Sequence, residues 1–422
     1  SRQRLPRVIR PIQRCPMRHL LCPTCSASEP EHHGQRQEGL LYMFEHAARC
    51  RERGQTPLSS PPNCSTSTAF SFTSCIMKRC IFLFGLGLVA LSACRPEATW
   101  QSWAAPSAIR TLDVLAEGQI RYAAAEGWVG QTLDHGETWT QTQWLAPDST
   151  TPSFRSSASN GTHWFAASIA SPAWIAQAPL RSLEPTWVHH DTSAAVFLDA
   201  MAWWNAEEGL VFGDPMDGCL TLLDTRDAGQ SWQRLSCDDV PQHTPGEAGF
   251  AASNGNICIQ GDTAWIFTGG VASRCLRSSD RGHNWKAIGL PIRQGESMTG
   301  VFGASFANAR DGVAIGGHWE HPDDNVGNLI ATADGGTTWT PISEGAGPGY
   351  RSCIQHHPRR SQEIVAVGFK GMDVSFDGGQ TWEHVHDTSA YVARFAPEGR
   401  TLWLAGKDRI HRVDWDNLAS EL

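Results

Sequence analysis

The chain has 422 residues, of which 41% are hydrophobic and 18% charged, and its net charge is −9. This composition excludes a coiled coil and a disordered polymer. Residues 95–422 hold all 18 Trp and carry 22 Lys and Arg against 38 Asp and Glu. Because such an acidic domain repels phosphate backbones, the sequence also argues against a nucleic-acid-binding protein.

Residues 1–76 differ from the remainder of the chain. They carry ten Arg and five Glu, with no Lys and no Trp, and they lack apolar periodicity. Cys22-Pro23-Thr24-Cys25 with nearby His residues suggests zinc, but the spacing to a second ligand pair matches no zinc module. We therefore expect a disordered extension that originates from an upstream reading frame.

Residues 77–94 have the pattern of an export signal. Met77-Lys78-Arg79 form a positive n-region and residues 81–90 form an apolar h-region that is too short to span a bilayer. Leu91-Ser92-Ala93-Cys94 then resembles a bacterial lipobox, in which Cys94 is lipidated and becomes the mature N-terminus. An ordinary signal peptide with an incidental Cys is the alternative. Arg95 after the Cys favours the outer membrane by analogy with other lipoproteins.

One motif, Ser/Thr-x-Asp-x-Gly-x-x-Trp, recurs along residues 95–418. Its five full copies occupy residues 132–139, 225–232, 278–285, 332–339 and 375–382, and a decayed copy ends at Trp187. An Asp at the start of a tight turn accepts backbone N–H groups, and the Gly permits a positive φ. The Trp then buries a large ring on the returning strand. The motif therefore predicts the closing turn of a β-hairpin.

The repeat length predicts a β-propeller. The six motif Trp residues are 43 to 54 residues apart, and further short β-rich runs precede each copy, which corresponds to four strands per unit. After Trp382 only three strands remain, and residues 98–106 supply a fourth. Joining the two ends closes a ring of seven blades and removes an exposed sheet edge. The expected fold is thus an all-β, seven-bladed propeller of four-stranded antiparallel blades, with six blades as the alternative.

Exported cysteines face an oxidising compartment. Cys219 and Cys237 lie symmetrically about a predicted tight turn, so a disulfide between them is expected. Pairing of Cys258 with Cys275 is a weaker expectation. Cys353 is then the odd one and is interpreted as a buried small hydrophobe rather than a reactive thiol.

Candidate binding residues fall on the first strand of each unit, because the innermost strand of a propeller blade lines the central channel. Arginines from separate blades would grip an anionic group, with a carboxylate as acid or base. The alternative is that these charges neutralise one another and hold the blades together. The candidates are Arg110, Arg155, Asp199, Glu247, Tyr350, Arg351 and Arg394.

Two other groups of polar residues are interpreted as structural. The stretch from His318 to Asp324 suggests a metal site, but its Pro and charges favour a solvated loop, so no metal and no cofactor is predicted. The motif carboxylates are expected to hold turns away from the channel. These are Asp134, Asp227, Asp280, Asp334 and Asp377.

The repeats and their flanking segments resemble one known family. The segments are 153–159, 197–218, 246–254, 349–353 and 366–382. They are similar to the seven-bladed WD40/YVTN/BNR-like (Asp-box) repeat proteins, which include photosystem II stability/assembly factors and members labelled "oxidoreductase". The resemblance implies a non-enzymatic scaffold for a membrane or envelope protein. It gives no support to a redox role, because the chain has no Gly-rich dinucleotide turn and no haem or flavin motif.

The alternative function is glycoside hydrolysis, as in the sialidase-like Asp-box superfamily. Tyr350 would act as a nucleophile beside an arginine triad, or Asp199 would pair with Asp214 or Glu247 as two carboxylates. However, residues 109–113 read Ile-Arg-Thr-Leu-Asp, where sialidases have an Arg-Ile-Pro strand. We therefore expect a monomeric, lipid-anchored propeller with a protein client in the cell envelope, and a glycan as the alternative ligand.

Overall fold

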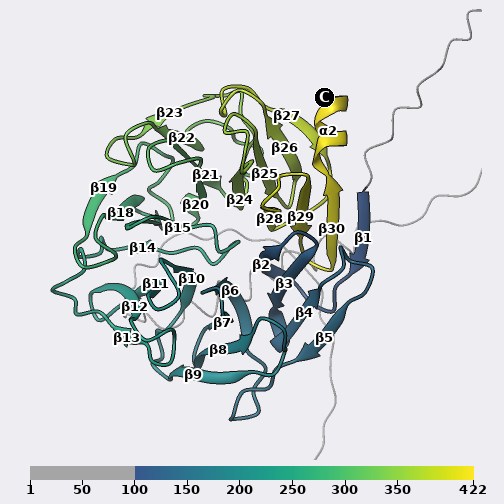
Figure 1. The fold of residues 1–422 in the computed structure, drawn as a ribbon. Helices are drawn as coiled ribbons and strands as arrows, with labels where there is room; N and C mark the ends of the chain where they lie inside the picture. The colour runs from purple at the N-terminus through teal and green to yellow at the C-terminus, as the bar shows by residue number, and fades with distance from the viewer. Residues whose placement is uncertain (1–99) are drawn as a thin grey trace, which may run out of the picture. The chain divides into compact units, whose positions relative to one another are not determined.

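The computed structural model describes residues 100–422, and the predicted extension and export signal lie outside this range. Seven antiparallel sheets are arranged as blades around a central axis (Figure 1). The prediction of a seven-bladed propeller is confirmed, and the six-bladed alternative is wrong.

Each blade contains four strands, and we number the blades in chain order with the innermost strand first. Blade 1 contains β2 (Ile109–Ala116), β3 (Gln119–Ala124), β4 (Trp128–Thr132) and β5 (Thr140–Gln143). Blade 2 contains β6 (Ser153–Ser159), β7 (His163–Ile169), β8 (Ala173–Pro179) and β9 (Thr186–Asp191). Blade 3 contains β10 (Leu198–Trp203), β11 (Gly209–Met216), β12 (Cys219–Thr225) and β13 (Gln233–Arg234).

Blades 4 to 6 follow the same order. Blade 4 contains β15 (Ile257–Gln260), β16 (Thr263–Phe267), β18 (Arg274–Ser278) and β19 (Lys286–Gly289). Blade 5 contains β20 (Thr299–Phe306), β21 (Gly312–His318), β22 (Leu329–Thr332) and β23 (Thr340–Pro341). Blade 6 contains β24 (Cys353–His356), β25 (Ile364–Gly368), β26 (Gly371–Ser375) and β27 (Glu383–His386).

Blade 7 is built from both ends of the described chain. Its strands are β28 (Val392–Phe395), β29 (Thr401–Ala405), β30 (Arg409–Asp414) and β1 (Trp100–Ala104). β1 pairs antiparallel with β30 over its whole length, as Figure 1 shows where the blue strand lies beside the yellow one. The ring is therefore closed as the strand count predicted. A short helix, α2 (Trp415–Glu421), follows β30 and packs Trp415 and Leu418 into the core.

The additional elements are small. η2 (Ala125–Gly127) is a single 3-10 turn between β3 and β4. Two strands of two residues each, β14 (Glu247–Ala248) and β17 (Gly269–Gly270), pair with one another, and β17 joins the sheet of blade 5 at its inner edge. The long connection between blades 3 and 4 thus contributes to the sheet of blade 5.

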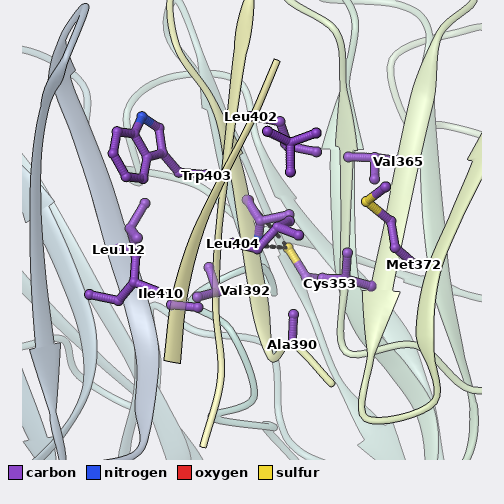
Figure 2. Close-up of a cluster of buried hydrophobic side chains, with 14 of the residues drawn as sticks. Leu112, Cys353, Val365, Met372, Ala390, Val392, Leu402, Trp403, Leu404 and Ile410 are labelled. Carbon is purple, nitrogen blue, oxygen red and sulfur yellow. Dashed lines mark hydrogen bonds between the residues drawn. The ribbon is translucent and has the colours of Figure 1, made fainter. Parts of the chain in front are cut away.

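Hydrophobic side chains between adjacent blades form the core. Figure 2 shows the contact of blade 7 with its two neighbours, where Trp403 and Leu404 of β29 lie between Leu112 of blade 1 and Met372 of blade 6. Each of these four side chains is fully buried. Because burial of a large apolar side chain contributes about 1.5–3 kcal/mol, blade-to-blade contacts of this kind stabilise the ring as a whole.

The inner strands of adjacent blades lie close together around the axis. Gly303 on β20 illustrates this closeness, because a Cβ at this position would lie 3.3 Å from the Cα of Cys353 on the inner strand of blade 6. Since every blade repeats the same strand order, the inner strands run in the same sense along the axis. They begin at one end of the channel, which we call the N-terminal end. They finish at the other end, which we call the Asp-box end because the turns after the third strands lie there.

The repeated motif forms the turn between the third and fourth strands of five blades. In blade 5, Asp334 Oδ1 accepts the N–H of Thr338 at 2.9 Å and Oδ2 accepts its hydroxyl at 2.7 Å. The hydroxyl of Thr332 donates to Asp334 and accepts the N–H of Gly336. The hydrogen bonds from Thr338 lower the pKa of Asp334 to about 2. The carboxylate therefore holds the turn while ionised.

The other four motif carboxylates also accept the backbone N–H of the residue four positions later, together with its side-chain hydroxyl or, at Asp280, the amide of Asn284. The five carboxylates are Asp134, Asp227, Asp280, Asp334 and Asp377. Blade 2 has Glu184 and Pro185 in the decayed copy, and blade 7 has no such turn, because its third and fourth strands come from opposite ends of the chain.

Candidate functional site

Four inner strands carry a β-bulge at the same point near the N-terminal end of the channel. The extra residue is Arg110 on β2, Arg155 on β6, Asp199 on β10 and Phe302 on β20. A bulge bends the strand and redirects the side chain of the extra residue. The backbone therefore repeats in four blades while the side chain varies, which is an arrangement suited to recognition.

Arg110 and Arg155 are half-buried at this end of the channel. The guanidinium of Arg110 lies over the ring of Tyr391, 4.1 Å from its centroid, which is close enough for a cation–π contact. Tyr391 directly precedes the inner strand of blade 7. The two arginines thus come from different blades, as the sequence predicted.

Asp199 is fully buried, and its pKa is raised well above the ordinary value by burial and by the adjacent Asp214. The positive charge of Arg155 and a hydrogen bond with the backbone of Ala251 act in the opposite direction and lower the pKa of Asp199. Asp214 Oδ1 accepts the N–H of Gly249 at 2.8 Å. Two neighbouring buried carboxyl groups cannot both ionise without cost, so the Asp199–Asp214 pair retains a proton at higher pH than ordinary carboxyl groups.

Glu247 does not lie on the innermost strand of a blade, which corrects the placement expected from the sequence. It belongs to β14, and the inner strand of blade 4 is β15. Its carboxylate accepts two bonds from Arg274, at 2.9 and 2.6 Å, and further bonds from the Thr268 hydroxyl and the Thr244 N–H. Its partners therefore lie in the connection between blades 3 and 4, which holds Thr244, and in blade 4, which holds Thr268 and Arg274. The repeat pattern did not reveal this because an extra strand pair interrupts it here.

Tyr350 and Arg351 lie immediately before β24 and are almost completely buried. The ring of Tyr350 packs edge-on against Phe302, and burial raises the pKa of its hydroxyl. Arg351 Nε donates to Asp373 Oδ2 at 2.5 Å, and Asp373 also bonds His384 at 3.0 Å. Arg351 is therefore held by an ion pair within blade 6. This agrees with the alternative in which the candidate charges neutralise one another instead of binding a ligand.

The segment 249–256, which we call the plug, crosses the channel. Its first half faces the N-terminal end, where Phe250 stacks on Phe302 with centroids 4.0 Å apart. Its second half is bonded to several blades. The bonds run from Ser253 Oγ to Ser352 O, from Asn254 Nδ2 to Ser157 O, from the Met201 N–H to Asn254 Oδ1, from the Ala304 N–H to Gly255 O, and from Arg394 Nη2 to Ser253 O.

A cavity of about 450 Å³ lies at the Asp-box end. The later parts of all seven inner strands line it, and Asn254 and Gly255 of the plug form part of its wall. The charged side chains in its lining are Asp113 and Arg394. Of the predicted residues, only Arg394 lines this cavity. Asp113 is not among the residues predicted from the sequence, although it stands three residues after Arg110 on the same inner strand.

Asp113 is held rigidly. Its Oδ2 accepts hydrogen bonds from the Ser157 hydroxyl and, at 2.7 Å, from Trp164 Nε1. Burial raises the pKa of Asp113, while these bonds and the charges of Arg394 and Arg121 act in the opposite direction. Arg394 donates from Nη1 to Ala393 O and Cys353 Sγ and from Nη2 to the plug.

The cysteines follow the sequence prediction in one case and not in the other. Cys219 and Cys237 are joined by a disulfide. Cys258, Cys275 and Cys353 are free, so the weaker expectation of a Cys258–Cys275 bond is wrong. The reason is topological, because β16 lies between the strand of Cys258 and that of Cys275.

Two further observations concern residues 100–422. The stretch 318–324 begins at the end of β21 and forms the loop before β22, and no cluster of three or more His, Cys, Asp or Glu in the described range is arranged to hold a metal ion. No helix there is long and apolar enough to cross a membrane. Cys94, the predicted lipidation site, lies outside the described residues.

Comparison with known proteins agrees with the repeat pattern. The BNR/Asp-box repeat model matches residues 373–384, which contain the last copy of the motif. No curated protein sequence matches the chain. The fold is similar to that of YCF48 from Cyanidioschyzon merolae, with a TM-score of 0.57, 12% identity and coverage of 75% of this chain and 99% of that one.

Two other solved structures show the same likeness. YCF48 bound to D1 peptide gives a TM-score of 0.51 with 15% identity, covering 74% of this chain and 96% of that one. The GH74 enzyme of Niastella koreensis gives a TM-score of 0.54 with 14% identity, covering 72% of this chain and 52% of that one. At these identities the likeness establishes the fold. The chain is a seven-bladed β-propeller that contains a BNR/Asp-box repeat, and its fold is similar to that of YCF48.

Proposed function

We propose that this chain is a non-enzymatic scaffold that binds an anionic segment of a protein client at the N-terminal end of its channel. The observation that carries the proposal is the repeated bulge, which directs Arg110 and Arg155 of neighbouring blades to one end of the channel, with Arg110 stacked on Tyr391. Guanidinium groups bind carboxylates through paired hydrogen bonds. A propeller of similar fold, YCF48, has been solved with a bound peptide.

The contacts of the predicted catalytic groups favour binding over hydrolysis. Glu247 is bonded to Arg274, Tyr350 is buried among aromatic rings, and Asp199 lies beneath the plug, where a Cβ on Gly249 would lie 2.3 Å from its Oδ2. A glycosidase needs two carboxyl groups open to a sugar ring.

We further propose that the protein is exported and anchored in the cell envelope through a lipid on Cys94, with the outer membrane as its site. This rests on the lipobox and on Arg95. Incorporation of radiolabelled palmitate into the expressed full chain, lost in Cys94→Ser, is the expected result. Incorporation that persists in this variant would overturn the anchor without affecting the client site.

The client site is tested by cross-linking and recovery of the full chain from cells. Recovery of one envelope protein with the wild type, lost in the double variant Arg110→Gln/Arg155→Gln, is the expected result. Arg359→Gln is the matched control, because Arg359 is an exposed arginine paired with Glu398 on another part of the surface. A partner retained equally by both variants would contradict the proposal.

Hydrolysis of a glycan is the second candidate, and one observation favours it. A carboxyl group with a raised pKa beside a second carboxylate is the arrangement of a general acid, and Asp199 with Asp214 has this property. Turnover of a glycan panel by the purified chain, abolished in Asp199→Asn, together with recovery of no client, would establish this activity in place of scaffolding.

A further inference from the structure

The cavity at the Asp-box end is separate from the proposed client site. The plug lies between them, because Gly249 and Phe250 contact residues of the N-terminal end whereas Asn254 and Gly255 line the cavity. Its volume of about 450 Å³ is within the range of small-molecule sites, roughly 300–1,000 Å³. The plug makes it a pocket with one closed end rather than part of an open channel.

The two charged side chains of the pocket are held in place by hydrogen bonds. Ser157 and Trp164 hold Oδ2 of Asp113, and within residues 100–422 no group bonds its Oδ1. Arg394 is fixed by Nη1 and Nη2, and no described residue accepts from its Nε. A half-buried carboxylate and a half-buried guanidinium each gain free energy from a bound partner of opposite charge.

Asp113 and Arg394 do not neutralise each other directly. Each is within electrostatic range of the other, but no ion pair within 4.0 Å joins them. Ser159, Gln260, Ser305 and Gln355 supply uncharged polar groups around them. The pocket therefore presents one negative and one positive group that are separated from one another, a pattern complementary to a ligand carrying both charges.

The remaining lining is mixed, and most of its exposed surface is polar. Leu115, Met201, Trp203 and Phe306 also line the pocket, and these four residues belong to the hydrophobic cores between the blades. A small, polar, concave site with two fixed charges favours a small charged ligand.

We propose that this pocket binds a small zwitterion, an α-amino acid or a short peptide. Its ammonium group donates to Asp113 Oδ1 and its carboxylate accepts from Arg394. The ligand enters from the Asp-box end. This site does not depend on the client site, and its loss would leave the scaffold function intact.

Calorimetric titration of the full chain tests the proposal. L-leucine, the other nineteen α-amino acids and leucyl-leucine are the probes, with N-acetyl-L-leucine and L-leucinamide as analogues that lack one charge each. We expect leucine or leucyl-leucine to bind and each blocked analogue to bind about tenfold more weakly, because each loses one charged hydrogen bond. Tighter binding of leucyl-leucine would identify a peptide, and tighter binding of leucine a free amino acid.

Asp113→Asn is the matched variant, because the amide oxygen still accepts from Ser157 and Trp164. It should weaken leucine about tenfold and leave N-acetyl-L-leucine unchanged. Arg359→Gln, at an exposed arginine paired with Glu398, should leave both unchanged. The proposal is wrong if no probe binds, if the blocked analogues bind as tightly as leucine, or if Asp113→Asn has no effect. The comparison of analogues needs only the wild-type protein, so it holds even if the variant fails to fold.

Discussion

The carboxyl groups of this propeller fall into two classes that a sequence motif does not distinguish. Asp334 and its four equivalents are held ionised by N–H and hydroxyl donors of their own turn. Asp199 is fully buried beside Asp214, and burial and this neighbour raise its pKa. The same residue type is thus ionised in one setting and favoured as the neutral form in the other, because the turns supply hydrogen-bond donors whereas burial and a neighbouring carboxyl group act on Asp199.

The bond between Glu247 and Arg274 gives a prediction about stability. Glu247→Gln removes one charge of a pair in which the Glu side chain is fully buried, which leaves the guanidinium without its partner. We expect the free energy of unfolding to fall by about 3 kcal/mol in urea denaturation. Arg293→Gln, in the exposed pair with Asp324, should cost less than about 1 kcal/mol. Equal effects of the two changes would contradict this account.

The raised pKa of Asp199 gives a prediction about pH. A carboxyl group whose pKa is higher in the folded than in the unfolded protein binds more protons in the folded state, so stability declines as pH rises from the ordinary aspartate range to the raised value. One proton corresponds to about 1.4 kcal/mol per pH unit. Asp199→Asn should remove this decline, measured as urea midpoints from pH 4 to 8. An unchanged slope would show that Asp199 ionises normally.

At the scale of the elements, the plug is the feature that departs from a simple repeat. It follows a two-residue strand, crosses the channel and bonds the inner strands of several blades. Asn254 has the central position, with a positive φ of 54° and hydrogen bonds to Ser157 and Met201. An Asn tolerates this backbone conformation better than most residues. Its side chain joins blades 2 and 3.

Replacement of Asn254 by Ala should release the plug. Three buried backbone groups on β6 and β10 would lose their partner, and we expect a cost of about 2 kcal/mol. Hydrogen exchange measured by mass spectrometry should increase within residues 249–256 and on these two strands. Asn308→Ala, in an exposed loop between β20 and β21, serves as the control. Faster exchange spread evenly over all blades would argue against a local role.

At the scale of the whole molecule, ring closure depends on β1. Trp103 on β1 lies 5.6 Å from the ring of Trp139 in blade 1 and 5.7 Å from that of Trp403 in blade 7. One strand from the beginning of the described chain thus joins the last blade to the first. Each blade keeps an outer edge strand, but closure lets the apolar faces of the first and last blades pack against each other.

Trp103→Ala should weaken this closure. Loss of a partly buried indole should lower the free energy of unfolding by about 2 kcal/mol. Gln101→Ala, at an exposed position of the same strand, should change it by less than about 0.5 kcal/mol. Thermal and urea unfolding provide the comparison. If both variants unfold as the wild type does, β1 does not contribute to the closure of the ring.

The sequence by itself determined the architecture, because the Asp, Gly and Trp of each turn act through neighbouring residues and their spacing counts the blades. It also predicted the strand that closes the ring. The tertiary structure alone decided which polar residues meet. Glu247 left the inner strands because an extra strand pair interrupts the repeat, the plug divided the channel, and Asp113 joined Arg394 in a pocket although 281 residues separate them in the chain. Such long-range contacts depend on how seven blades converge on one axis, and a local pattern carries no record of that convergence.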